Sequence, residues 1–439
     1  MLTPGKILEK EPLLRVGIVL PEDKKKTITL EIPQPSACLF LVDGKETILP
    51  VDRKLNLSAT EKGLDISGEE TGTPARIVKL ILSEPGAWIL VNDVVAGRGF
   101  HWLKQIPVKL PCTVEIEARN KVLVLVNELP LETYLACVAT SEMSAECPDA
   151  YIEAQTIVAR SWMLANVEQK HVELGIDVCN DDCCQRYQGV NNITEKSRKG
   201  ALKTSGKVLM WKNSICDARY SKSCGGITEK FENLWGGEPL PYMQNIADAP
   251  TEFTLDLRSE DDIKTWVNSV PEAYCSPHYI PEDRLKKYLG DVDEDRTYFR
   301  WTEKVTQEEL SLNLADKIGI PVDKVIALTP LKRGGSGRLI ELEIRFRDKK
   351  GKIQSVLIEK DYEIRRVLHK KFLYSSAIVI KTLDPDPEGI PSAFIFRGAG
   401  WGHGAGLCQI GALGMSLKGF TAEEIVKHYY PGSELKKIY

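Results

Sequence analysis

The sequence has no marked excess of charge of either sign. Its 439 residues include 58 Lys and Arg and 62 Asp and Glu, which gives a formal net charge of −4. This balance supplies no positive field for nucleic acid or anionic lipid, so we expect neither as a partner. Hydrophobic residues make up 43% and charged residues 27%, as in an ordinary globular protein. A chain of this length predicts two or three domains with ample core.

Long apolar runs and a recognisable export signal are also missing. No run of about 18 apolar residues occurs, so the sequence predicts no membrane-spanning helix. The first residues, MLTPGKILEKEPLLRVGIVL, have an acidic residue among the early charges and no small-residue cleavage site. This makes a poor signal peptide. Either the protein stays inside the cell, or its export signal is not part of this sequence.

Cysteine is not dense enough for a disulfide scaffold. The 11 cysteines, an odd number, are ordinary for a reducing compartment. Cys179, Cys183 and Cys184 lie close together, with His171 shortly before them. Thiolates and an imidazole at this spacing form a candidate structural zinc site, although a zinc ribbon would need two separated pairs. Free thiols or one disulfide are the alternatives, and the vicinal pair is a poor disulfide because its geometry would strain the backbone.

Hydrophobic patterning predicts an α+β protein without repeats or low-complexity tracts. β-branched and aromatic runs separated by turn residues predict a β-rich domain over residues 1–110. A mixed α/β core follows at 111–254 and resumes at 391–439. Residues 255–390 are expected to form an inserted α+β subdomain. The predicted limits are therefore 1–110, 111–254, 255–390 and 391–439.

Capping and turn signals locate the main helices and one hairpin. Helices are predicted over about 131–143 and 148–166, the second with Pro148 in its first turn and a stripe of small residues. Capping boxes at Thr306–Glu309 and Thr421–Glu424 each predict a helix start. Alternating apolar residues at 340–346, followed by DKKGK, predict a strand hairpin.

Glu142 is the first candidate catalytic residue. Leu131, Leu135, Val138 and Glu142 fall on one helical face, so Glu142 continues an apolar stripe in the last turn. Partial burial and the negative end of the helix dipole both favour the protonated carboxyl group, as a general acid requires. The alternative is a solvated glutamate at a frayed helix end. Glu132, in the first turn, needs no functional explanation.

Arg160 and His403 are further candidates. Arg160 lies on the small-residue helix, where it either holds a carboxylate or substrate oxygen or makes a structural ion pair. In GWGHGAGLCQIGALG, glycines at 402, 404 and 406 flank His403 and allow a close backbone approach. The stretch lacks the lysine of a P-loop and the context of a dinucleotide-binding motif. His403 could be an acid/base, a hydrogen-bond donor in a sugar cleft, or a buried structural histidine.

Several motifs, in order, resemble the SpoIID/LytB family of sporulation lytic transglycosylases and amidase enhancers. They are LPLETYLACVATSEM, AYIEAQTIVARSW, DVCNDDCCQRYQGV, YSKSCGGITE, LWGG, PYMQNIAD, SGRLIELEI, GWGHGAGLCQIGALGMSLKG and HYYPGSEL. They run from about residue 120 to the end. One departure is Cys224 in YSKSCGG, a position that serine often occupies in the family.

The resemblance implies cleavage of peptidoglycan glycan strands with Glu142 as the catalytic acid and His403 in the same cleft. It also implies that His171, Cys179, Cys183 and Cys184 are a candidate zinc site, although this chain has a cysteine where some members have a histidine. Trp235 and Tyr242 could stack on sugar rings or pack in the core. The remaining residues assigned to substrate binding, or to holding Glu142, are Gln155, Arg160, Ser161, Ser221, Ser223, Thr228, Gly402, Gly404 and Gln409.

The expected reaction suits one carboxylate. A glycoside hydrolase uses two carboxyl groups, whereas a lytic transglycosylase uses the muramyl 6-hydroxyl as nucleophile, so one glutamate can act as acid and then base. The products would carry 1,6-anhydroMurNAc ends, and catalysis itself would need no cofactor. The alternatives are a non-catalytic glycan-binding module that enhances a cell-wall amidase, and an intracellular protein on this fold with another carbohydrate ligand. The substrate implies the cell envelope or periplasm, and the absent signal peptide leaves a cytoplasmic location open.

Overall fold

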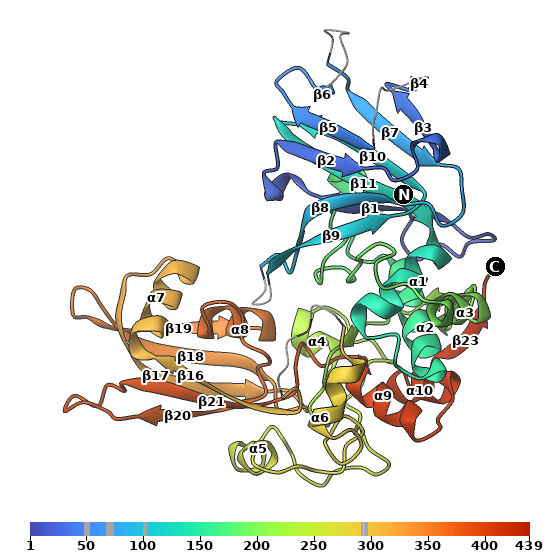
Figure 1. Cartoon of the computed structure of the whole chain (residues 1–439). Helices are drawn as coiled ribbons and strands as arrows, with labels where there is room; N and C mark the ends of the chain where they lie inside the picture. Colours follow the sequence, from blue (N-terminus) through green and yellow to red (C-terminus); the bar gives the residue numbers. More distant parts are fainter. Residues whose placement is uncertain (48–52, 67–73, 100–102, 291–292, 294–296) are drawn as a thin grey trace.

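The computed structural model describes residues 1–439 except 48–52, 67–73, 100–102, 291–292 and 294–296. It has a mixed α+β fold with several sheets, as predicted. Figure 1 shows β-sheets built by the first part of the chain above a group of helices, and a second strand-rich unit beside those helices. No helix of the described residues is long and apolar enough to cross a membrane.

The N-terminal strands form two sheets. One has the order β12-β1-β11-β10-β7-β3-β4 and the other β6-β5-β2-β8-β9. The strands are β1 (Leu13–Val19), β2 (Thr27–Glu31), β3 (Cys38–Val42), β4 (Lys45–Glu46), β5 (Lys54–Ala59), β6 (Leu64–Ile66), β7 (Ile77–Leu82), β8 (Ile89–Ala96), β9 (Lys104–Leu110), β10 (Thr113–Arg119), β11 (Val122–Pro130) and β12 (Val178–Cys179). The β-branched and aromatic runs of residues 1–110 thus form strands, as predicted, because their alternate apolar residues face a shared core.

Helices follow β11 and build the centre of the molecule. They are α1 (Leu131–Glu142), α2 (Asp149–Ala165), α3 (Glu195–Lys203), α4 (Phe231–Trp235), α9 (Gln409–Leu417) and α10 (Ala422–Tyr429). Pro148 is the N-cap of α2 rather than a first-turn residue, because its ψ of 155° is extended. Thr421 caps α10 through a capping box, as predicted. Contacts of α2 with α1, α3, α9 and α10 place this small-residue helix in the middle of the group.

Short strands join the helical centre to the glycine-rich motif. They are β13 (Lys207–Trp211), β14 (Ser214–Ile215), β15 (Tyr220–Ser221), β22 (Leu407–Cys408) and β23 (Glu434–Lys437). β15 covers only Tyr220 and Ser221. β15 pairs in parallel with β22, which aligns Tyr220 with Leu407 and Ser221 with Cys408. Residues almost two hundred positions apart thereby become neighbours.

The strand-rich unit beside the helices contains two further sheets, β16-β21-β20 and β17-β18-β19. Its elements are α5 (Glu260–Val267), β16 (Arg300–Thr306), α7 (Gln307–Ile318), β17 (Val322–Arg333), β18 (Leu339–Asp348), β19 (Ile353–Glu359), α8 (Asp361–Leu368), β20 (Ile378–Leu383) and β21 (Ala393–Ala399). The short helix α6 (Glu282–Leu285) packs with the helical centre instead. The predicted capping box at Thr306 and the predicted hairpin are both confirmed.

Sheets cross two of the expected domain limits. β10 pairs with β7, so strands on both sides of residue 110 share a sheet. β21 pairs with β16 and β20, so the sheet of the inserted unit extends past residue 390. Backbone pairing is a long-range property that composition does not reveal. The four domain ranges therefore remain predictions of which segments of the chain fold as independent units.

Candidate functional site

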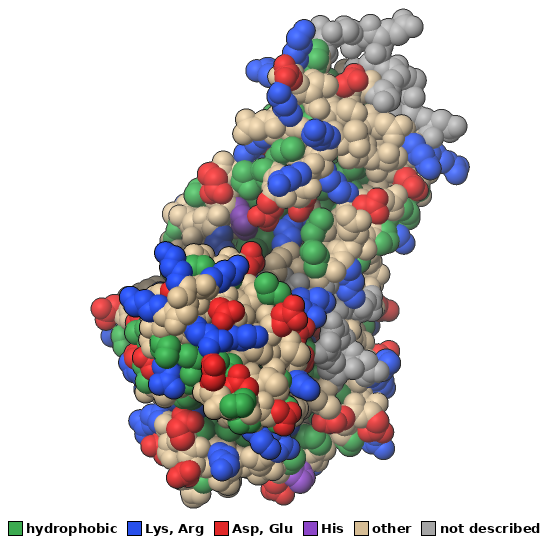
Figure 2. Space-filling model, turned by 90° about the vertical axis from the view of Figure 1, so that its left-hand side faces the viewer, with side chains coloured by type: hydrophobic (Ala, Val, Ile, Leu, Met, Phe, Trp, Pro, Cys, Tyr) green, Lys and Arg blue, Asp and Glu red, His purple; other side chains and the backbone are tan. Residues whose placement is uncertain are grey.

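A cavity of about 500 Å³ lies where the three parts of the chain meet. Figure 2 looks onto the unit of β17–β19, over which acidic and basic side chains intermix. The cavity is lined by residues of the N-terminal part, the helical centre and α8. They include Arg98, Glu142, Asp182, Arg186, Arg219, Tyr220, Ser221, Lys222, Trp235, Asp293, Asp361, Tyr362, Arg365, Trp401, Gly402, His403 and Gln409. Glu142 and His403, selected from motifs 261 positions apart, thus share one cavity.

Glu142 is the last residue of α1 and is 7% exposed. Leu131, Leu135 and Val138 of the same face are fully buried, so the helix directs Glu142 inward rather than to solvent. Its Oε1 accepts hydrogen bonds from Arg186 N (3.0 Å) and Tyr220 Oη (2.9 Å). Its Oε2 accepts one from Gln409 Nε2 (3.3 Å). The carboxyl group is therefore held in one orientation at the cavity wall.

The other carboxylates of the cavity make ion pairs. Glu168 pairs with Lys170 and Arg219, Asp182 with Arg186, Asp293 with Arg186 and Lys222, and Asp361 with Arg365. The hydrogen bonds of the Glu142 carboxyl group within the described residues come from a backbone amide, a phenol and a side-chain amide, which are neutral donors. Glu142 thus differs from its acidic neighbours in the donors of these hydrogen bonds, although the Arg186 guanidinium also interacts with it electrostatically.

Lys222 and Asp293 fix the end of α1. Lys222 Nζ donates to the backbone oxygen of Glu142 (2.8 Å) and to Asp293 Oδ2 (2.8 Å). Asp293 Oδ1 accepts from Arg186 Nη1 (2.8 Å). Burial alone would raise the pKa of Asp293, but Lys222 and Arg186 outweigh it and hold that pKa at about 2. Asp293 is therefore a permanent anion that organises two cations around Glu142.

The glycine-rich motif approaches the β15 segment closely. Gly404 has φ +76°, and a Cβ there would lie 2.2 Å from Cζ of the fully buried Arg338. Gly404 N donates to Ser221 Oγ (3.1 Å). A side chain at this turn would clash as well as strain the backbone. The glycine therefore allows the motif to place Gly402 and His403 at the cavity.

His403 is partly buried and packs edge-on against Trp235, with ring centroids 4.9 Å apart. Its Nδ1 accepts from Ala405 N (3.1 Å), and its ring also interacts with the Tyr220 backbone. Burial, together with Arg219, Arg365 and Arg338, lowers the pKa of His403 well below its usual range. The imidazole is therefore neutral at neutral pH. These contacts orient Trp235, and a catalytic role for His403 remains a prediction.

Aromatic side chains line the rest of the cavity. Trp235 also lies under Arg219, with the guanidinium carbon 4.2 Å from the ring centroid. Trp401 stacks on Tyr374 at 4.2 Å with an interplanar angle of 11°. By contrast, Tyr242 is buried and accepts a hydrogen bond at its Oη from Asp217 N (3.0 Å). Tyr242 is therefore a core residue, whereas Trp235 and Trp401 are among the aromatic groups that line the cavity.

Arg160 does not reach the cavity. Its fully buried guanidinium makes hydrogen bonds with both carboxylate oxygens of Glu132, with the backbone oxygen of Lys207 and with Thr204. A structural ion pair was one of the two roles predicted for Arg160, and these contacts agree with it. A role of Arg160 in orienting substrate or Glu142 remains a prediction that these contacts do not favour, because Glu132 occupies the guanidinium. Glu132 thus has a structural function as the partner of a buried cation.

Four other residues assigned to substrate binding are buried away from the cavity lining. Ser161 Oγ bonds Ile157 O and Leu209 N. Thr228 Oγ1 bonds Gln244 O and Ile246 N. Gln155 accepts from Tyr151, and Ser223 pairs through its backbone with Trp401. All four side chains are at most 1% exposed, so direct contact with a substrate is excluded in this conformation.

Sequence reasoning missed several residues that contact Glu142 or its backbone. Tyr220 and Lys222 stand in YSKSCGG, and Arg186 stands in CCQRYQGV, both quoted as family motifs. Nothing in their local pattern distinguishes them from surface residues. The parallel pairing of β15 with β22 brings Tyr220 and Gln409 to the same carboxyl group. A motif alone indicates that this segment matters, but not which side chain faces Glu142.

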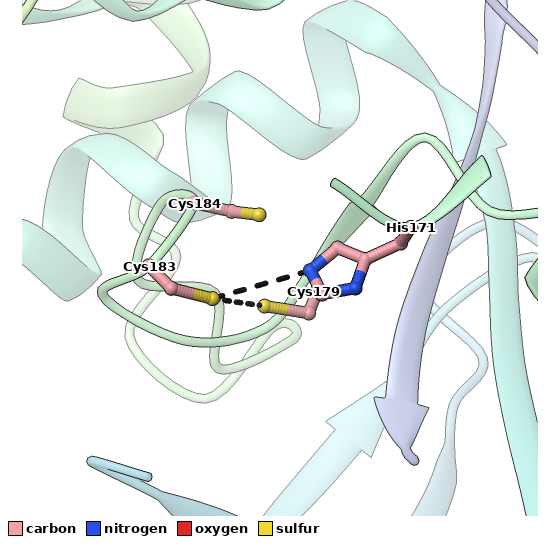
Figure 3. A group of neighbouring side chains, drawn as sticks. All are labelled: His171, Cys179, Cys183 and Cys184. Atoms are coloured by element: carbon pink, nitrogen blue, oxygen red, sulfur yellow. Dashed lines mark hydrogen bonds between the residues drawn. The ribbon is translucent and has the colours of Figure 1, made fainter. Parts of the chain in front are cut away.

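His171, Cys179, Cys183 and Cys184 converge on one another (Figure 3), and Cys183 and Cys184 also line the cavity. Their ligand atoms lie within 4.8 Å of one another, with Cys179 Sγ 3.1 Å from Cys183 Sγ and His171 Nε2 4.0 Å from Cys183 Sγ. All the cysteines of the chain are free thiols. Three sulfurs and one imidazole are a donor set that suits zinc, so the cluster could hold a metal ion. It also precedes Arg186, whose backbone amide contacts Glu142.

Two family models match this chain. One, described as Stage II sporulation protein (SpoIID), matches residues 119–211, which include Glu142 and the cysteine cluster. The other, a domain of unknown function (DUF8618), matches residues 229–406, which include His403. Together the two segments contain most of the cavity wall.

Similar curated proteins are distant in sequence. An uncharacterized protein of Brachyspira hyodysenteriae is 25% identical over 72% of this chain and 69% of its own length. Stage II sporulation protein D of Bacillus subtilis is 23% identical, over 79% of this chain and 84% of its own length. The amidase enhancer of Bacillus subtilis is 24% identical over 68% of this chain but only 39% of its own length.

Proposed function

Because this chain carries a SpoIID family domain and is distantly related to stage II sporulation protein D and to the amidase enhancer, we propose that it is a cell-wall lytic transglycosylase. It would cleave the MurNAc–GlcNAc bond of peptidoglycan glycan strands and leave 1,6-anhydroMurNAc ends. The observation that carries the proposal is Glu142. Its buried carboxyl group faces the cavity and is held there by neutral donors.

The environment of the other carboxylates supports a reaction with a single acid/base. A hydrolase needs a second carboxyl group as nucleophile or as base for water. Asp293, the buried candidate, has Oδ1 bound by Arg186 and Oδ2 bound by Lys222 and by Gly290 N. With both oxygens occupied, Asp293 is poorly placed to attack a sugar or activate water. This leaves a substrate group as the nucleophile.

The proposed reaction proceeds in two proton transfers. The Glu142 carboxyl group first gives its proton to the glycosidic oxygen, the C1–O bond breaks, and C1 acquires oxocarbenium character. The resulting carboxylate then takes the proton of the muramyl 6-hydroxyl as that oxygen bonds to C1. The proton returns to Glu142 and no water is consumed. Tyr220 and Gln409 keep the carboxyl group in place through both transfers.

The aromatic groups of the cavity suit sugar binding. Sugar rings present apolar C–H faces, which pack well against indole and phenol rings. Trp235 is fixed by His403 and Arg219, and Trp401 by Tyr374. Rigid aromatic surfaces of this kind would bind neighbouring sugars of a strand without reorganising, while Ser221 and the Gly402 backbone offer polar contacts in the same wall.

Loss of the Glu142 carboxyl group is the direct test. Glu142→Gln should lower the rate of release of anhydro-muropeptides from purified glycan strands by at least about 100-fold, as expected for removal of a general acid. The matched control is Glu146→Gln, the same change at an exposed residue four positions later. Mass spectrometry identifies the anhydro ends. Equal rates for wild type and Glu142→Gln would overturn the proposal.

The relation to the amidase enhancer supports a second candidate, a glycan-binding module that stimulates an amidase. It predicts that wild-type protein binds strands and stimulates a cell-wall amidase without producing anhydro ends. Glu142→Gln would leave that stimulation unchanged. Measuring product ends and amidase stimulation on the same preparations separates the two functions.

We also propose that the cluster of His171, Cys179, Cys183 and Cys184 holds a structural zinc ion. No catalytic step involves it. Bound zinc would fix the loop that supplies the Arg186 amide to Glu142. Elemental analysis of wild type and Cys179→Ser tests this site, since the variant should contain about one zinc ion fewer per chain. Equal zinc content in both would exclude it.

A further inference from the structure

A second group of metal-binding residue types lies inside the helical centre, apart from the cavity lining. Cys224 follows β15, Asp248 and Cys275 stand on two loops, and Cys408 is the last residue of β22 and the N-cap of α9. All four residues are at most 3% exposed. Four segments that are distant in sequence thus converge on one buried point.

The spacing of the ligand atoms suits a single ion. The three Sγ atoms and a carboxylate oxygen all lie within 4.8 Å of one another, and Cys224 Sγ is 3.8 Å from Cys275 Sγ. Zinc with Zn–S bonds of about 2.3 Å in a tetrahedron separates two sulfurs by about 3.8 Å. An iron–sulfur cluster, whose cysteines bind different irons, needs a wider arrangement.

Hydrogen bonds from backbone amides and one tyrosine point at the ligand atoms and suit sulfur and oxygen ligands in their anionic form. Cys408 Sγ accepts from Cys224 N (3.2 Å) and Gly411 N (3.3 Å), and Cys224 Sγ accepts from Gly226 N (3.4 Å). Asp248 accepts from Cys275 N (3.0 Å) and from Tyr429 Oη (2.5 Å). Such an outer layer of donors is typical of metal sites, where it orients the ligands.

The buried position of Asp248 is suited to a cation. Asp248 is fully buried, and its contacts given above are with neutral groups. A carboxyl group so placed stays neutral unless a bound cation compensates its charge. The Arg300 guanidinium, which donates to Gly225 O (3.0 Å), interacts with Cys224 and Cys275 and is a further positive group near the site.

We propose that Cys224, Asp248, Cys275 and Cys408 bind one zinc ion as a buried structural site. Thiolate ligands disfavour magnesium and calcium, and a tetrahedral set dominated by sulfur favours zinc. The site would tie the β15 and β22 segments to the loops of Asp248 and Cys275. Gln409, which contacts Glu142, directly follows Cys408, and Lys222 lies two residues before Cys224. Zinc here would therefore fix two groups that position Glu142.

The test must separate this site from the cluster of Figure 3. The double variant His171→Ala/Cys183→Ser removes two ligands of that cluster, of which Cys183 is exposed. We expect this variant to retain about one tightly bound zinc ion per chain. Adding Cys408→Ser should remove that ion, whereas adding Cys216→Ser, at a buried cysteine outside both groups, should not.

Cobalt exchange keeps the test valid if Cys408→Ser does not fold. The double variant loaded with Co²⁺ should show the intense visible absorption of a tetrahedral ion and thiolate-to-cobalt charge transfer. A folded double variant that contains neither zinc nor cobalt would overturn the proposal. A disulfide between Cys224 and Cys275, found by peptide mapping without reduction, would overturn it as well. These readouts are independent of glycan cleavage.

Discussion

Tyr220 and Gln409 reach Glu142 from segments that follow it by 78 and 267 positions. Their donors fix the orientation of the carboxyl group, and they do so without bringing a positive charge to it. In the proposed reaction this fixed orientation is needed in both proton transfers, because the Glu142 carboxyl group must first give a proton and then take one. A donor that holds the group should therefore affect turnover more than binding.

Tyr220→Phe tests that expectation. The change removes the Oη hydrogen bond to Glu142 and leaves the ring in place. A lost hydrogen bond of about 0.5–1.5 kcal/mol predicts a fall in kcat of up to about tenfold, with KM little changed. Tyr279→Phe, on a loop outside the cavity lining, is the control and should match wild type. An effect on KM alone would contradict a role in orienting Glu142.

His403 makes stability depend on pH. Its folded-state pKa lies well below the usual value of 6.5, chiefly because of burial. Below that usual value the unfolded chain binds a proton that the native imidazole does not, so stability falls as the pH decreases through about 6.5. At higher pH the contribution is complete.

Urea unfolding at about pH 7.5 and about pH 5.5 measures this difference. His403→Gln should show a smaller loss of unfolding free energy between the two pH values than wild type. His278→Gln, at an exposed histidine, should keep the wild-type difference. If His403→Gln and wild type lose the same free energy, the native histidine is protonated like the unfolded one.

The turn at Gly404 combines a left-handed backbone with a close approach to Arg338. Gly404→Ala and Gly419→Ala both place Ala at positive φ, which costs about 1–2 kcal/mol. At Gly419 a Cβ meets nothing within 4 Å, whereas at Gly404 it meets the buried guanidinium. Gly404→Ala should therefore melt several degrees lower than Gly419→Ala. Equal melting temperatures would show that Arg338 can move aside.

Short-range signals account for the elements that were predicted correctly. The N-caps Thr306 and Thr421 and the hairpin of β18 and β19 each depend on a few neighbouring residues. The two-residue strand β15 could not be predicted, because its pairing partner β22 lies far along the chain. For the same reason, the sheets shared across residues 110 and 390 were not foreseen.

The candidate site also contains residues that local spacing could predict and residues whose positions depend on long-range packing. The spacing of apolar residues on one face of α1 predicted a buried Glu142, with a solvated glutamate as the alternative, and the structure has it buried. The burial of Arg160, Ser161 and Thr228 away from the cavity depends on which segments pack together. The buried group of Cys224, Asp248, Cys275 and Cys408 gave no local signal, since its members stand singly in four segments.

The molecule as a whole contains separate hydrophobic clusters. One joins the N-terminal sheets to α1 and α2, another fills the helical centre, and a third joins β16–β21 with α7 and α8. Separate cores tend to unfold in separate steps. Calorimetry should therefore show a larger enthalpy than a two-state fit of the melting curve gives.

Phe346→Ala assigns one of these steps. Phe346 is 1% exposed in the third cluster, and its truncation should cost about 3–5 kcal/mol. The transition of that cluster should move to lower temperature while the others stay. Leu80→Ala, in the first cluster, should shift a different transition. A single transition that moves with both variants would mean that the chain unfolds as one unit.

The cavity wall takes Arg98 from the N-terminal part, Glu142 and His403 from the helical centre, and Arg365 from α8. A ligand that fills it would contact all three parts at once, and would do so only in the native state. Small glycan fragments should accordingly delay melting in proportion to the logarithm of their concentration. Melting temperatures measured with glycan fragments of different length and stem-peptide content could then rank the affinities of these fragments without an assay of cleavage.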